Sequence, residues 1–186
     1  MEAIKLNKKS ILQAVDFLNS GEVVIFPTDT VYGFLALAEN RKAINKIYKI
    51  KKRPKTKPLP VFVKDLRMAK ELAEISEKQE KILKNKWPGK YTFVLSSLRG
   101  VATTKQSIAL RIPKYKPLND LLKKINKPLA QTSVNISGQN PLIKITDIEV
   151  QFAKRKILLV DSGDLKKSKP SKIIDLTENK IKFLRK

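Results

Sequence analysis

The sequence predicts an α/β or α+β domain in which helices flank a mixed β-sheet. Two features of the chain predict this class. Short apolar runs of about four or five residues, the length of buried strands, recur from one end of the chain to the other. Segments whose apolar residues return at helical spacing separate these runs. The 186 residues fit one domain, residues 1–186, without an internal repeat.

Capping boxes mark three predicted helix starts. In such a box, a hydroxyl and a Gln or Glu three residues later satisfy amide groups of the first turn. The pairs are Ser10 with Gln13, Ser76 with Gln79, and Thr146 with Glu149. Two more helices are predicted to begin near Asn40 and after Pro117, a residue that the first turn tolerates.

Eight apolar runs between these helices are predicted strands. They are residues 23–26, 60–63, 91–95, 108–112, 129–132, 157–160, 173–176 and 181–184. The polar stretch 164–171 is predicted to be a loop, either a solvated connection or a lid.

Composition removes several function classes. The chain has no cysteine and no histidine, so it lacks disulfides, thiolate nucleophiles, the commonest general base and the commonest metal ligand. An enzyme with this composition is expected to work by positioning substrates and neutralising charge, as in phosphoryl and nucleotidyl transfer. The longest apolar runs are far too short to cross a bilayer, which predicts a cytoplasmic protein with no membrane partner.

The formal net charge of +23 favours polyanionic ligands such as nucleotides or RNA. Only seven of the 40 basic residues are arginine, and the chain is rich in Ile and Asn. A coding bias towards AT-rich codons explains the surplus of lysine equally well, so the charge supports an anionic ligand without identifying it.

Polar residues follow the predicted strand at 23–26. Pro27 ends the ladder because it has no amide hydrogen, and Thr28, Asp29 and Thr30 come directly after it. The carboxyl edge of an α/β sheet is where ligands usually bind. A ligand site and a plain turn both remain open for this loop.

The helix from Asn40 places Lys51 on its apolar face, seven residues after Ile44. Pro54 disfavours helical geometry at Arg53, so the chain is expected to break there and turn the guanidinium outward. Lys51 and Arg53 together form a candidate phosphate clamp. The alternative is a lysine that snorkels from a helix end, where cations are favoured anyway.

Four further segments carry candidate or ambiguous groups. Residues 131–138 place hydroxyls and an amide after a predicted strand, although such residues also build ordinary loops. Arg111 alternates with the apolar residues of its strand and faces either a cavity or water. Trp87 is most simply a core anchor. The pair Asp161 and Asp164 resembles a metal site, but a turn is the favoured interpretation.

The order and spacing of these motifs resemble the YrdC-like family over nearly the whole chain. The matching elements are Pro-Thr-Asp-Thr-x-Tyr-Gly at 27–33, Lys-x-Arg-Pro at 51–54, Pro-Gly-x-x-Thr at 88–92, Arg-Ile-Pro at 111–113, Ser-x-Asn-x-Ser-Gly at 133–138, Pro170-Ser171 and the closing Leu184-Arg185. The chain ends just after Arg185, so it is expected to be of the family's short form.

This resemblance implies a single YrdC-like domain whose twisted mixed sheet surrounds a deep basic cavity. The implied activity is an ATP-dependent condensation of L-threonine with bicarbonate, giving threonylcarbamoyl-AMP and pyrophosphate. A tRNA-modifying transferase complex would then move the threonylcarbamoyl group to an adenosine of certain tRNAs. Mg²⁺ is the implied cofactor and accompanies ATP; no protein metal site is predicted.

The resemblance also implies roles for individual residues. Lys51 and Arg53 would be catalytic. Threonine would be held by Thr30, Arg111 and Ser171, and ATP would be contacted by Arg53, Ser107, Ser133, Asn135 and Arg185.

Two alternatives remain. The same basic surface suits a non-catalytic module that binds double-stranded RNA or tRNA, and the related YciO-like branch has a less clear biochemical role. The intact 28–30 and 133–135 elements favour the synthase.

Overall fold

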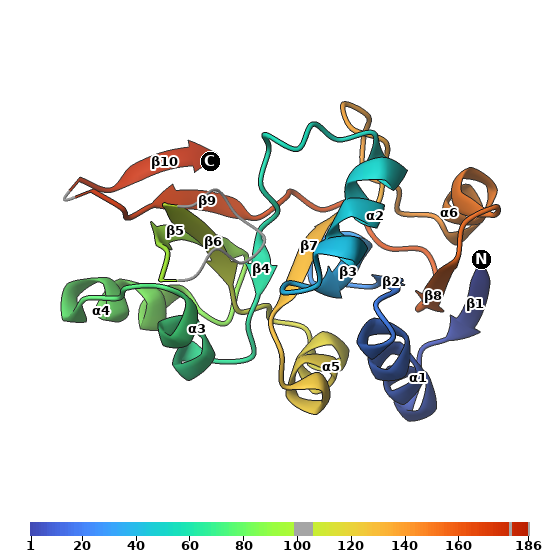
Figure 1. Ribbon diagram of the computed structural model, residues 1–186, viewed down its shortest axis with the longest axis horizontal. Helices are drawn as coiled ribbons and strands as arrows, with labels where there is room; N and C mark the ends of the chain where they lie inside the picture. Colours follow the sequence, from blue (N-terminus) through green and yellow to red (C-terminus); the bar gives the residue numbers. More distant parts are fainter. Residues whose placement is uncertain (99–105, 179, 186) are drawn as a thin grey trace.

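The computed structural model describes residues 1–98, 106–178 and 180–185, whose strands form one sheet flanked by helices (Figure 1). The strand order is β1-β8-β2-β3-β7-β4-β6-β5-β9-β10. The strands are β1 (Glu2–Lys5), β2 (Val23–Phe26), β3 (Gly33–Leu37), β4 (Val61–Phe62), β5 (Tyr91–Ser96), β6 (Ser107–Arg111), β7 (Leu129–Ser133), β8 (Ile157–Asp161), β9 (Lys172–Asp175) and β10 (Lys182–Arg185). The predicted mixed α/β class is confirmed.

Six helices are described: α1 (Lys8–Asn19), α2 (Arg41–Lys51), α3 (Leu66–Leu72), α4 (Glu77–Lys86), α5 (Lys116–Ile125) and α6 (Ile145–Phe152). Figure 1 shows α1 and α5 side by side on one side of the sheet and α2 on the other. Within the described residues, no helix combines the length and apolar character that crossing a membrane requires.

Both faces of the central strands are covered. In β2, Val24 and Phe26 pack with the apolar sides of α1 and α5, whereas Val23 and Ile25 belong to a second core that includes α2 and α6. Alternate residues of a strand point to opposite faces, so a strand buried on both sides reads as a continuous apolar run. This is why the run at 23–26 was recognisable.

Strand register brings the candidate loops to one edge. Strands β1, β8 and β2 are parallel, so the carboxyl ends of β2 and β8 meet at the same edge. Strand β3 runs antiparallel to β2 and β7, and its first residue, Gly33, lies opposite Phe26 and Ser133. The loop after β2 and the turn after β7 are therefore neighbours.

The other half of the sheet carries Arg111. Strand β6 pairs with β4 in parallel and with β5 antiparallel, and Arg111 lies opposite Phe62. Strand β5 continues in parallel to β9, which places Thr92 opposite Ile173, two residues after Ser171.

Several expected element boundaries were correct and others were wrong. The Ser76–Gln79 box caps α4, and Asn40 caps α2. Helix α1 instead begins at Lys8, because Asn7 is its cap and Ser10 completes that box from inside the helix. Helix α6 begins at Ile145 and has no side-chain cap, so Thr146 lies inside it.

Strands β1 and β3 and helix α3 were not predicted. Strand β1 is short and largely exposed, and helix α3 has seven residues. Strand β3 begins at Gly33 inside the motif that was interpreted as a loop. Trp87 is buried and packs edge-on against Phe93, so its interpretation as a core anchor is confirmed.

Candidate functional site

The loop after β2 is held by the Thr28 side chain. Its hydroxyl donates to the carbonyl oxygen of Val31 at 2.7 Å and accepts from the amide of Thr30 at 3.0 Å. It also accepts from the amide of Val31 at 3.3 Å, and it lies 3.0 Å from the hydroxyl of Thr30. The Thr30 hydroxyl can both donate and accept, which suits a polar group on a ligand.

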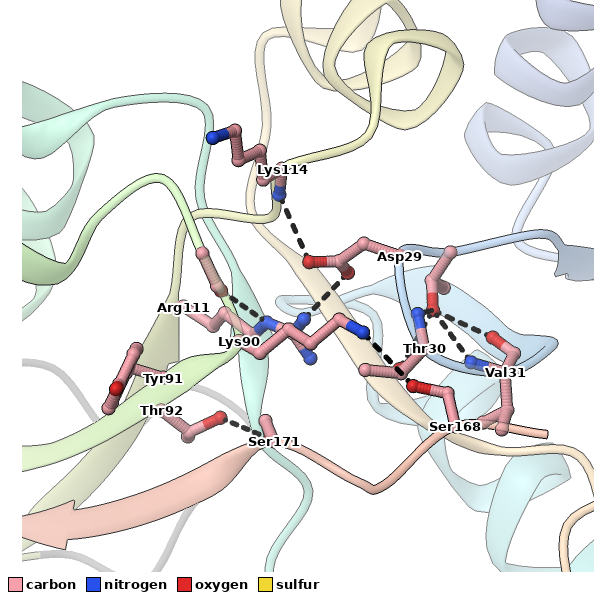
Figure 2. A network of polar contacts seen from close by, with 12 residues as sticks. Asp29, Thr30, Val31, Lys90, Tyr91, Thr92, Arg111, Lys114, Ser168 and Ser171 are labelled. Carbon is pink, nitrogen blue, oxygen red and sulfur yellow. Dashed lines mark hydrogen bonds and ion pairs between the residues drawn. The ribbon is translucent and has the colours of Figure 1, made fainter. Parts of the chain in front are cut away.

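Asp29 forms a buried ion pair with Arg111 (Figure 2). Its Oδ1 accepts from Nη2 of Arg111 at 2.6 Å, and its Oδ2 accepts from the amide of Lys114 at 3.2 Å. The side chains of Arg111 and Asp29 are only 2% and 7% exposed. The open question whether Arg111 faces a cavity or water thus has a more specific answer: it faces a carboxylate.

Two further contacts fix the Arg111 guanidinium. Its Nε donates to the carbonyl oxygen of Gly89 at 3.0 Å, and its carbon lies 5.7 Å from the centre of the Phe62 ring, a cation–π contact. Burial lowers the pKa of Arg111, and Asp29 opposes that shift. The group remains a cation, because arginine does not lose its proton in proteins.

Ser171 lies in a second polar cluster beside Arg111. Its hydroxyl is 2.9 Å from that of Thr92, and Arg185 donates to both its hydroxyl and its carbonyl oxygen, at 3.1 and 2.7 Å. Burial and the positive charge of Arg111 lower the pKa of Arg185. Figure 2 shows Thr92 and Ser171 pointing towards each other next to Arg111.

Lys51 lies at the other candidate cluster, at the end of α2, and is 2% exposed. Its ammonium donates to the carbonyl oxygens of Ser133 and Asn135 and to Oδ1 of Asn135. The Ser133 hydroxyl donates to the same Oδ1 at 2.9 Å. An inward-facing lysine is therefore confirmed, and all three of its N–H bonds hold the turn after β7.

Opposing effects act on the charge of this lysine. Burial, and secondarily the positive charge of Arg53, lower the pKa of Lys51 to about 7. The three acceptors favour the ammonium, because a neutral amine has only two N–H bonds to donate. In this arrangement the ammonium could reach a phosphate only by leaving one of its acceptors, so the phosphate clamp stays a prediction.

Arg53 follows α2 beyond Lys52, whose left-handed conformation ends the helix. Its guanidinium donates to the carbonyl oxygens of Lys57 and Pro58, both at 3.0 Å. The expected break at the Lys-x-Arg-Pro element is confirmed, and the side chain bends back over the loop that follows.

The two clusters are linked through β3 and β7. The amide of Val134 donates to the carbonyl oxygen of Tyr32, and a Cβ at Gly33 would lie 3.4 Å from the Thr28 methyl group. The loop that carries Thr28–Thr30 thus touches the strand end that carries Ser133. Ser107 lies at the start of β6, four residues before Arg111 and roughly 13 Å from it along the strand, opposite Ser96, and its contact with ATP stays a prediction.

The deep basic cavity implied by the resemblance stays a prediction. Two hollows lie away from these clusters: one of about 540 Å³ beside Asn40 and Lys127, and one of about 370 Å³ beside Gln13 and Leu158.

The two candidate carboxylates, Asp161 at the end of β8 and Asp164 three residues later, belong to a turn. Asp161 pairs with Lys5 and accepts from the amide of Gly163, whose φ is 80°, while Asp164 accepts from the amide of Ile145. In the described ranges, no three acidic, histidine or cysteine side chains cluster in a way that would hold a metal ion.

Sequence reasoning missed the partners of Asp29 and the contact of Thr92 with Ser171. The sequence did point to Thr92, because this residue ends the Pro-Gly-x-x-Thr motif. No feature of the sequence indicated the Asp29–Arg111 pair, because the two residues are 82 positions apart in the chain.

The chain is similar to several named proteins. A Methanocaldococcus jannaschii protein named "Putative threonylcarbamoyl-AMP synthase" is 34% identical over 187 residues, which cover 97% of this chain and 89% of that protein. The Aliivibrio fischeri threonylcarbamoyl-AMP synthase is 29% identical over 174 residues, which cover 90% of this chain and 94% of that protein.

Solved structures share the fold. Pyrococcus abyssi Sua5 complexed with L-threonine matches with a TM-score of 0.90 and 31% identity, over 99% of this chain and 56% of that one. The chain thus spans about half of that longer protein. E. coli YciO matches with a TM-score of 0.89 and 25% identity, over 100% of this chain and 94% of that one. The family model of Sua5, YciO and YrdC, described as "Telomere recombination", matches residues 16–186. The predicted resemblance is therefore confirmed, and the chain belongs to the Sua5/YciO/YrdC family.

Proposed function

We propose that this protein is a threonylcarbamoyl-AMP synthase, which condenses L-threonine, bicarbonate and ATP to threonylcarbamoyl-AMP and pyrophosphate. The observation that carries the proposal is a buried arginine, Arg111, among the hydroxyls of Thr30, Thr92 and Ser171. A cation beside hydroxyl groups suits an amino acid that has a carboxylate, an amine and a hydroxyl. Relatives named as synthases, one of them matched over 94% of its length, support the same reaction.

Threonine is proposed to bind between Thr30, Arg111 and Ser171. The Thr30 hydroxyl lies beside the Thr28 hydroxyl and suits a hydrogen bond with the amine or the hydroxyl of the substrate. The threonine carboxylate suits Arg111, because the Nη1 group of that guanidinium has no acceptor among the described residues. Ser171 is fixed beside it by Arg185.

ATP is proposed to contact Arg53, Ser107, Ser133, Asn135 and Arg185, with Lys51 and Arg53 offsetting the charge of the triphosphate. The Lys51 ammonium holds Ser133 and Asn135 in one turn. That contact supports a role for Lys51 in arranging the ATP-binding turn.

The proposed chemistry needs no protein nucleophile, which agrees with a chain that lacks cysteine and histidine. The threonine amine combines with bicarbonate to give a carbamate, with loss of water. A carbamate oxygen then attacks the α-phosphorus of ATP, and the bond to the β-phosphate oxygen breaks to release pyrophosphate. The protein has to align two anions and stabilise the charge that grows on the leaving group.

Mg²⁺ is proposed to arrive with ATP, held by phosphate oxygens and water. The bound ion would neutralise charge on the triphosphate. The product would pass to a tRNA-modifying transferase complex, because an acyl adenylate is an activated donor that a second enzyme must consume.

Pyrophosphate release tests the proposal. We expect release to require ATP, L-threonine and bicarbonate together, and to fall at least tenfold in Lys51→Ala or Ser133→Ala. Lys78→Ala on the exposed side of α4 is the matched control and should leave the rate unchanged. A wild-type protein that binds RNA tightly but releases no pyrophosphate would instead support the RNA-binding module.

A further inference from the structure

Asp29 is not one of the residues proposed to bind threonine or ATP, but it contacts Arg111, which is. We propose that Asp29 is a positioning residue: it holds Arg111 so that the Nη1 edge of the guanidinium faces the carboxylate of the amino-acid substrate. The inference rests on the proposed function and names the residue that orients its amino-acid site.

Asp29 joins three segments at one point. It lies in the loop after β2, pairs with Arg111 at the end of β6, and accepts from the amide of Lys114, which precedes α5. Arg111 is held from a fourth segment by the carbonyl oxygen of Gly89. A carboxylate with both oxygens engaged cannot rotate without breaking two hydrogen bonds, so it fixes the group it pairs with.

The contacts leave one edge of the guanidinium available. Nε donates to the carbonyl oxygen of Gly89 and Nη2 donates to Oδ1 of Asp29. Among the described residues, Nη1 has no acceptor. It is also not one of the fully buried polar atoms without a partner, so a ligand can reach it. A guanidinium fixed on two sides and available on a third is prepared to bind a carboxylate through Nη1.

Asp29 could instead compete with the substrate carboxylate for Arg111, and the geometry argues against that role. Withdrawing Asp29 would break its bond to Lys114 and leave a cation that is only 2% exposed without its counter-ion. The two roles predict opposite changes in the affinity for the amino acid when Asp29 is replaced. Removing a competitor would tighten the binding of the amino acid, whereas removing a positioning residue weakens it.

Asp29→Asn tests the role, because the amide keeps the size of the side chain but replaces one acceptor oxygen with a donor nitrogen. That nitrogen would face either the guanidinium or the Lys114 amide, both of which are donors. Binding of L-threonine, of L-threoninol, which lacks the carboxylate, and of ATP is measured by calorimetry on the full chain. Asp65→Asn is the matched control, since Asp65 caps α3 outside the site and asparagine caps a helix equally well.

We expect Asp29→Asn to raise the Kd for L-threonine at least tenfold while the Kd values for L-threoninol and ATP change less than twofold. Unchanged ATP binding also shows that the variant is folded. Asp29→Glu keeps the charge at a different length and should weaken threonine binding less than Asp29→Asn does.

Two results would overturn the inference while leaving the proposed function intact: unchanged or tighter threonine binding in Asp29→Asn, or an equal loss for threonine and threoninol. Wild-type protein that binds no L-threonine would overturn the proposed function and this inference with it.

Discussion

Lys51 and Arg111 are both buried cations, but their hydrogen-bond partners differ in charge. Arg111 has a carboxylate partner, Asp29, whereas Lys51 has three uncharged oxygen acceptors from Ser133 and Asn135. Lys51 has no counter-ion among the described residues, so burial penalises the charged form and lowers the pKa of Lys51 to about 7. Lys51 should therefore contribute to the pH dependence of the free energy of unfolding.

We expect the wild type to gain stability relative to Lys51→Met as the pH rises from about 7 towards 10. In that window the folded protein holds a neutral amine while the unfolded chain, with an ordinary lysine pKa, still binds the proton. The unfolded state then binds more protons, so stability rises with pH by up to about 1.4 kcal/mol per pH unit. Urea unfolding of both proteins at pH 7.5, 8.5 and 9.5 measures the difference. Parallel curves would mean that Lys51 keeps its proton in the folded protein.

The residue types of the candidate site could be predicted from the sequence, but their partners could not. Lys51 was recognisable because helical periodicity placed it on the buried side of α2. Nothing in the spacing indicated that its acceptors come from residues 133–135, or that Asp29 pairs with Arg111, because these contacts depend on how β3, β7 and β6 pair in the sheet.

At the scale of single elements, continuous apolar runs were the dependable signal. Strands β2 and β8 are buried along their whole length and were recognised within one residue. Strand β1 could not be recognised in this way, because it lies at the edge of the sheet and most of its residues are exposed. Capping residues were ambiguous where two polar side chains were available, as at the start of α1.

Substitutions at the start of α1 separate the two possible caps. Asn7→Ala should lower the free energy of unfolding by about 1 kcal/mol, because Asn7 accepts from the Ser10 amide at 2.9 Å. Gln13→Ala should leave stability nearly unchanged, since Gln13 is exposed and lies in the second turn of the helix. Thermal unfolding of both variants measures this. The reverse ranking would favour a cap at Ser10.

At the scale of the whole molecule, the sheet assembles the candidate site from distant segments. The loop after β2, the end of β6 and the segment before β9 meet around Arg111, and the ends of α2 and β7 meet around Lys51. The alternation of strands and helices predicted the fold class, whereas the strand order that brings these segments together emerged only from the structure.

The net charge of +23 is a property of the whole molecule, and it does not distinguish an enzyme from an RNA-binding module. A chain with this charge is expected to bind RNA in a salt-dependent manner whatever its function. Discrimination has to come from the chemistry of the product.

The most direct measurement supplies ¹³C-bicarbonate with ATP and L-threonine and follows the adenylate product by mass spectrometry. The account predicts a threonine-containing adenylate that carries the labelled carbon, formed in equal amount to pyrophosphate. Pyrophosphate released without label in the adenylate, or no adenylate at all, would contradict the assignment of this protein as a threonylcarbamoyl-AMP synthase.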